Sequence, residues 1–118
     1  MADAAQLEAL YQEGFNYRCN GQYSEARMAL QRVLQADPNH VKARHQMGLI
    51  QGFEGDFDGS LASLQALSNQ VPTDTEVRYD LAMTQMMLGM IDEAVANFKL
   101  ILLANPNHEK ARQQMAYF

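Results

Sequence analysis

Two stretches of the chain, Pro38-Asn-His-Val-Lys-Ala-Arg-His-Gln-Met47 and Pro106-Asn-His-Glu-Lys-Ala-Arg-Gln-Gln-Met115, are nearly identical and lie 68 residues apart. Half of that distance, 34 residues, separates the three prolines and three of the seven glycines, at Pro38, Pro72 and Pro106 and at Gly21, Gly55 and Gly89. A fixed period of this length is the signature of a stacked-repeat architecture. The chain is therefore one small unit written three times, with a partial fourth.

Between these prolines and glycines, apolar residues fall at helical spacing and never in strict alternation, so an all-α fold is predicted. Proline ends the second helix of each unit because it offers no N–H, and glycine permits the positive φ at which the first helix ends. Seven helices are expected, near residues 4–20, 24–36, 40–53, 58–70, 74–88, 92–104 and 108–118.

The residues at the helix starts are expected to act as caps, since short polar side chains accept hydrogen bonds from the free N–H groups of the first turn. The expected caps are Asp3 with Gln6, Asn39, Thr73 with Glu76, and Asn107. Inside the first helices, one repeat position holds a small residue that lets two helices approach closely; it is occupied by Gly14, Gly48 and Ala82.

At 118 residues, 47% apolar and 19% charged, the chain has the composition of a soluble folded protein. Its net charge of −5 argues against nucleic-acid binding, which rests on Lys and Arg neutralising phosphates. The single cysteine, Cys19, excludes an intramolecular disulfide and is expected to be buried or half-buried. There is neither a signal peptide at the start nor an apolar run of about eighteen residues, so the compartment stays open, with a cytoplasmic one favoured.

The repeat resembles the tetratricopeptide repeat, whose signature is a small residue in helix one, an aromatic residue three positions later, Ala in helix two, a large apolar residue four later, and then Pro. The matching residues are Gly14, Tyr17, Gly21, Tyr23, Ala26, Leu30 and Pro38 in repeat one, Gly48, Gly55, Phe57, Ser60, Leu64 and Pro72 in repeat two, and Ala82, Gly89, Ile91, Ala94, Phe98 and Pro106 in repeat three. The chain departs from the pattern at Gln51 and Gln85, which replace the aromatic residue, and at Gly59-Ser60.

This resemblance covers nearly all of the chain and implies a right-handed α-solenoid of three helix-turn-helix units with a seventh, capping helix. It implies a single domain over residues 3–118, with repeats at about 5–38, 39–72 and 73–106 and the capping helix at 107–118. Pentatricopeptide repeats, RNA-reading relatives of similar length, are disfavoured by the acidic charge and by the consistent Gly/Ala/Pro phase.

No nucleophile–base pair, paired carboxylates or phosphate loop appears, so neither catalysis nor a cofactor is expected. Glu54–Gln65 resembles a calcium loop but ends in Gln where a bidentate Glu is required. The clustered methionines favour an adaptable apolar surface over a metal site; they are Met83, Met86, Met87 and Met90. The histidines are scattered and predict no metal site either; they are His40, His45 and His108. The ladder of Arg44, Arg78 and Arg112 favours pairing between repeats with Asp or Glu over an acidic-ligand track.

In tetratricopeptide folds the first helices line a concave groove, so the resemblance places the binding site on their second face. That face is aromatic and apolar in this chain, which commonly marks a partner site. The expected groove residues are Tyr11, Phe15, Arg18, Lys42, His45, Leu49, Phe53, Tyr79, Met83 and Met86. Packing between neighbouring first helices is the alternative role for these side chains.

Some tetratricopeptide proteins grip the acidic tails of heat-shock chaperones with a Lys/Asn/Arg clamp, but at those positions this chain has Tyr11, Phe15, Gln46, Glu76 and Asp80, so that ligand class is rejected. The favoured function is an adaptor or scaffold that binds an apolar helix or extended segment of a protein partner, without nucleic acid or membrane insertion. The alternatives are a small acidic chaperone that shields a hydrophobic client, similar to those of bacterial secretion systems, and a structural role in self-assembly through repeat ends or as the N-terminal module of a longer protein.

Overall fold

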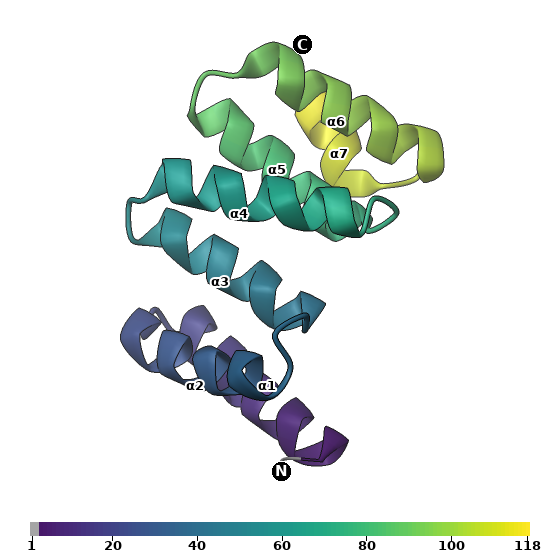
Figure 1. Cartoon of the computed structure of the whole chain (residues 1–118). Coiled ribbons are helices and arrows are strands. Elements are labelled where there is room, and N and C mark those ends of the chain that lie inside the picture. Colours follow the sequence, from purple (N-terminus) through teal and green to yellow (C-terminus); the bar gives the residue numbers. More distant parts are fainter. Residues whose placement is uncertain (1–2) are drawn as a thin grey trace. The chain divides into compact units, whose positions relative to one another are not determined.

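The computed structural model describes residues 3–118, and every regular element in that range is a helix (Figure 1). The helices are α1 (Ala4–Cys19), α2 (Tyr23–Ala36), α3 (Val41–Phe53), α4 (Phe57–Gln70), α5 (Thr75–Met87), α6 (Ile91–Ala104) and α7 (Glu109–Met115). The all-α prediction is confirmed. Each boundary lies within one residue of its predicted position, except the end of α7, which comes three residues early.

Each first helix ends where a glycine takes a positive φ, as predicted. Gly21, Gly55 and Gly89 have φ of 76°, 93° and 77°, and no other residue in the described range has a positive φ. Each glycine N–H bonds to a carbonyl in the last turn of the preceding helix, for example that of Gly21 to the carbonyl of Arg18 at 3.0 Å. The turn from first to second helix is thus the same in all three repeats.

The helix caps differ in part from the prediction. Asp3 and Gln6 form the expected capping box, but His40, not Asn39, caps α3, because its Nδ1 accepts the N–H of Ala43 at 3.1 Å. The same holds 68 residues later, where His108 caps α7 in place of Asn107, and Asp74 replaces Thr73 at α5.

The chain divides into two compact units inside α4, one ending at Ser63 and the other running from Leu64 to Phe118. The first unit packs α1 against α2 and α3 around a core of Ala26, Leu30, Val33, Ala43 and Ile50, all at most 1% exposed. Gly14 permits the close approach of α1 to α2, because a Cβ there would lie 2.8 Å from Leu30 Cγ.

The second unit packs α5, α6 and α7 around Ala82, Ala94, Phe98, Ile101 and Ala111, none of which reaches solvent. From α7, Ala111 is fully buried and Met115 packs against this core. Phe118, which was expected to belong to the capping helix, lies beyond its end and is 52% exposed. The last residues form i→i+3 bonds, with Phe118 N–H to the carbonyl of Met115 at 3.2 Å, so the α-helix tightens and stops.

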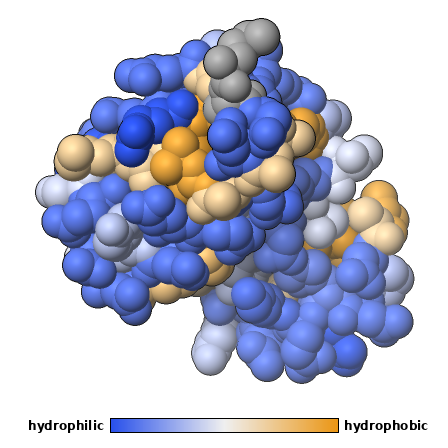
Figure 2. All heavy atoms as spheres, turned by 90° about the horizontal axis from the view of Figure 1, so that it is seen from below, coloured by the Kyte–Doolittle hydropathy of each residue, from blue (hydrophilic) through white to orange (hydrophobic). Residues whose placement is uncertain are grey.

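None of the helices described is both long and apolar enough to cross a bilayer. In the view of Figure 2 most of the surface is hydrophilic, and apolar residues are visible in several separate small areas.

Candidate functional site

The predicted groove residues of the first unit belong to a continuous set of ring contacts. The ring of Tyr11 lies 6.2 Å from that of Phe15 and 5.6 Å from the imidazole of His40. Lys42, in the first turn of α3, places its Nζ 5.9 Å from the centre of the Tyr11 ring. The loop before α3 and the first turn of α3 therefore cover Tyr11.

Tyr11 was expected to be a groove residue that contacts a partner, but it is only 6% exposed and belongs to the core of its unit. Burial raises the pKa of its hydroxyl above the ordinary value of 10.0, and the nearby Glu8 carboxylate adds to the rise. Tyr11 supports the neighbouring rings and contributes little surface of its own.

Arg18 joins α1 to α3. Its Nε donates to Oε1 of Gln46 at 2.7 Å, and its Cζ lies 5.1 Å from the centre of the Phe15 ring and 5.8 Å from that of Phe53. Both distances are within the range of cation–π attraction. Phe53, at the end of α3, also stacks on Tyr23 of α2, with the ring centres 5.6 Å apart and the planes at 12°.

Phe53 is nevertheless 53% exposed, a large open fraction for a phenylalanine. Phe15, Arg18, His45 and Leu49 are half-buried and Lys42 is exposed, so the predicted residues other than Tyr11 do reach solvent. Sequence reasoning missed two residues that hold them: Gln46, which is 6% exposed, and Tyr23. For Gln46, the one signal was a polar residue on a face that is otherwise apolar.

The second unit repeats part of this arrangement at a distance of 68 residues. The ring of Tyr79 lies 5.8 Å from that of His108, with Nζ of Lys110 5.8 Å from its centre. We call this arrangement the Tyr–His–Lys triad; it consists of Tyr11, His40 and Lys42 in the first unit and Tyr79, His108 and Lys110 in the second.

The remaining contacts of Tyr79 also lie within the second unit. Its ring is 5.9 Å from that of Phe98, and Met83 and Met86 are half-buried beside the same core. At the cap of α7, Nε2 of His108 is 3.4 Å from a carboxylate oxygen of Glu76. The predicted residues of this unit thus form a partly open apolar face on α5.

The departures from the repeat signature at Gln51 and Gln85 have a structural counterpart. Gln51 Oε1 accepts a hydrogen bond from Ser63 at 2.6 Å, and Gln85 Oε1 accepts one from Asn97 at 2.7 Å. These hydrogen bonds link the two helices of repeat two and of repeat three, at the position that Tyr17 occupies in repeat one.

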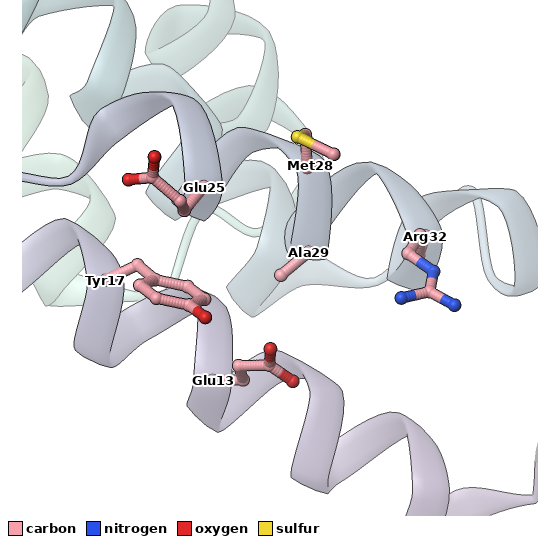
Figure 3. Close-up of a pocket in the computed structure, with 6 residues that line it drawn as sticks. All are labelled: Glu13, Tyr17, Glu25, Met28, Ala29 and Arg32. Carbon is pink, nitrogen blue, oxygen red and sulfur yellow. The ribbon is translucent and has the colours of Figure 1, made fainter.

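In repeat one that position lies beside a small hollow of about 170 Å³ between α1 and α2 (Figure 3). The hollow is lined by Glu13, Tyr17, Glu25, Met28, Ala29 and Arg32. Its volume is below the range of about 300–1,000 Å³ typical of small-molecule sites. It marks the place where this repeat lacks the hydrogen bond present in the other two.

Two carboxylates of the calcium-like segment have other roles. Glu54 pairs with Arg27, its two oxygens accepting from the guanidinium at 2.6 and 2.9 Å, and Asp56 accepts the N–H of Gly59 at 2.9 Å at the start of α4. Within residues 3–118, no three His, Cys, Asp or Glu side chains are grouped so as to hold a metal ion.

Two further expectations need correction. Cys19 is exposed, not buried, because it is the last residue of α1. Within residues 3–118, Arg78 of the arginine ladder bonds to neutral groups and not to a carboxylate; it donates to Asn97 Oδ1 at 2.8 Å and to the carbonyl of Pro72 at 3.0 Å. Its partners are thus neutral groups of its own unit.

Comparison with models of known protein families identifies the type of repeat. A family model described as tetratricopeptide repeat matches residues 54–116, which is more than half of the chain, and a second with the same description matches residues 7–40. Among curated protein sequences, none matches this chain at a significant level.

Solved structures share the fold. An O-GlcNAc transferase of Thermobaculum terrenum superposes with a TM-score of 0.85 at 23% identity, over 94% of this chain and 21% of the transferase. The first TPR of Spaghetti (RPAP3), bound to the HSP90 peptide SRMEEVD, superposes with a TM-score of 0.85 at 17% identity, over 98% of this chain and 92% of the Spaghetti chain. PcrH, in complex with the chaperone binding region of PopB, superposes with a TM-score of 0.82 at 21% identity, over 98% of this chain and 96% of PcrH. The chain therefore spans about a fifth of the transferase and nearly all of the other two, and at these identities the likeness is one of fold.

Proposed function

This chain belongs to the tetratricopeptide repeat family, and on that premise we propose that it is a non-catalytic protein-interaction module, which binds an apolar segment of a partner protein on the first helices of its repeats. The contact residues are Phe15, Arg18, Lys42, His45, Leu49 and Phe53 in the first unit and Tyr79, Met83 and Met86 in the second, with Tyr11 behind them. The proposal includes no cofactor and no nucleic acid.

The observation that carries this proposal is the exposed ring of Phe53. A lone exposed apolar residue needs no explanation, but Phe53 is continuous with Tyr23, Arg18 and Phe15, which hold it in one orientation. Rigid aromatic side chains lose little entropy on binding and commonly supply most of the interface energy. Support by analogy comes from two proteins of the same fold, of which one is bound to an HSP90 peptide and the other to a region of PopB.

The test is selection of peptides from a random displayed library, followed by affinity measurement on the selected peptides. Phe53→Ala is expected to weaken binding about tenfold, corresponding to about 1–2 kcal/mol for one anchor. Leu103→Ala is the matched control, because Leu103 on α6 is 81% exposed and lies outside the proposed face. Equal affinities for Phe53→Ala and the unchanged protein, with both folded by circular dichroism, would refute the assignment of this face.

A second candidate function is a dedicated chaperone for one hydrophobic client. It is favoured by the likeness to PcrH, of which this chain spans 96%. We expect a dedicated chaperone to raise the solubility of one unstable client that is produced with it, and an adaptor to bind several partners that are already folded. Co-expression followed by measurement of partner solubility separates the two functions.

A further inference from the structure

We propose that Arg18 forms a subsite for an acidic side chain of the partner segment, beside the apolar contacts of Phe15 and Phe53. This inference rests on the proposed function, because it concerns a subsite of the same face. It specifies that the segment carries Asp or Glu next to an aromatic or aliphatic residue.

The guanidinium of Arg18 is fixed before any partner arrives. Its Nε is bonded to Gln46, which is itself only 6% exposed, and its Cζ lies within 6 Å of the ring centres of both Phe15 and Phe53. A free arginine loses about 2 kcal/mol of side-chain entropy when it is immobilised. Here the fold has already fixed the side chain, so a ligand that binds it loses less.

The charge of Arg18 is also uncompensated. Among the residues that the structure describes, no carboxylate lies within ion-pairing distance of it, whereas Arg27 is paired with both oxygens of Glu54. No acceptor within residues 3–118 bonds to the Nη1 or Nη2 atom of Arg18. Since the same range has no buried side-chain nitrogen without a partner, these two atoms reach solvent.

A carboxylate is the group that fits these atoms. The two terminal nitrogens of a guanidinium donate two parallel hydrogen bonds, and this fork matches the two oxygens of Asp or Glu. The adjoining rings exclude water from one side and provide a surface for an apolar neighbour of the acidic residue. The subsite is distinct from the chaperone-tail clamp, whose cationic positions this chain fills with Tyr11, Glu76 and Asp80.

The experiment uses the whole chain and a phage-displayed library of random short peptides fused through their C-termini, so that no terminal carboxylate is present. The most enriched sequence is then synthesised with acetylated and amidated ends, once as selected and once with its acidic residue replaced by the matching amide. Each peptide is titrated against the unchanged protein, Arg18→Gln and the control Arg32→Gln, which removes the same charge from an exposed residue of α2.

We expect the acidic residue to be enriched beside an apolar one. Replacing it by its amide should weaken binding to the unchanged protein about tenfold or more, the usual loss for a charge-assisted hydrogen bond, and Arg32→Gln should behave in the same way. On Arg18→Gln, both peptides should bind equally weakly. The peptide replacement keeps the test valid even if Arg18→Gln fails to fold.

Three outcomes would overturn the inference, and they differ in what they say of the proposed function. Selected peptides that bind and depend on Phe53 but show no preference for Asp or Glu would refute the subsite and leave the binding face intact. A library that yields no binding peptide would overturn both the subsite and the face. Preference only for a free C-terminal carboxylate, added as a separate synthetic peptide, would also refute a side-chain subsite.

Discussion

The contact between α1 and α2 at Gly14 makes a quantitative prediction about stability. A Cβ at this position would lie 2.8 Å from Leu30 Cγ and 2.9 Å from Leu30 Cδ2, closer than real Cβ atoms approach other carbons. Leu30 is fully buried, so it has little room to move away. Gly14→Ala should therefore destabilise the protein, although alanine is the better helix former.

The expected free energies follow from opposing terms. The overlap costs about 2 kcal/mol, and the higher helix propensity of alanine returns about 1, so Gly14→Ala alone should lose about 1 kcal/mol. Leu30→Ala alone should lose about 3 kcal/mol by opening a cavity. In the double variant the overlap is gone and the propensity gain remains, so the loss should be about 2 kcal/mol, where simple addition gives about 4.

Urea unfolding followed by circular dichroism measures all four proteins, and equal slopes with denaturant show that the free energies are comparable. Gly52→Ala is the control, because a Cβ there would lie 3.2 Å from the Ser60 hydroxyl, a contact that a small shift relieves. If the double variant loses as much stability as the two single variants added together, then a Cβ at position 14 does not overlap with Leu30. That result would refute the close approach of α1 to α2.

Three further predictions concern a cap, a tyrosine and an ion pair. His40→Ala should cost about 1 kcal/mol in urea unfolding and His40→Asn much less, since asparagine also accepts the Ala43 N–H; equal losses would exclude a capping role. The pKa of Tyr11 is raised in the folded state, so the unfolded chain releases the hydroxyl proton at a lower pH than the folded protein does. The free energy of unfolding should therefore fall as pH rises above about 10, and Tyr11→Phe should lessen that fall. The same pH profile for Tyr11→Phe and the unchanged protein would contradict the burial of the Tyr11 hydroxyl. Arg27→Gln should cost at most about 1 kcal/mol, less in high salt, because both side chains of the pair are about one-third exposed; a larger, salt-independent loss would indicate a packing role.

The helices were predictable from sequence because their ends are local. A residue with positive φ is almost obligatorily glycine, and proline cannot continue a helix, so the 34-residue spacing of both residue types marks each boundary within a residue or so. The capping residues were less predictable because two neighbouring side chains can both occupy the capping position. Asp37 Oδ1 accepts the N–H of Asn39, which places Asn39 inside a turn, and His40 becomes the first residue that can cap α3.

The sequence predicted which helical face carries the candidate site, but not which side chains on that face are exposed to solvent. Helical spacing places Tyr11 and Phe15 on one side of α1, yet their exposure is decided by residues about 30 positions away. His40 and Lys42 cover Tyr11, whereas Phe53 lies beyond Arg18 at the end of α3 and stays open. The repeat pattern gives the position of each residue within its own repeat, but the side chain that covers it comes from the neighbouring repeat and depends on that repeat's sequence.

That dependence makes the two units chemically different, although their backbones repeat. Both contain the Tyr–His–Lys triad, but two periods after Phe15 and Arg18 the chain has Met83 and Met86. The first unit therefore offers a fixed cation between rings, and the second offers flexible thioethers, which adapt to apolar surfaces of varied shape. On the proposed function, the first unit selects partners by charge and geometry while the second tolerates many apolar side chains. Arg18→Gln should accordingly change which peptides are selected, whereas Met86→Leu, which keeps an apolar side chain of similar volume, should change affinity by less than about threefold and leave the selected sequences the same.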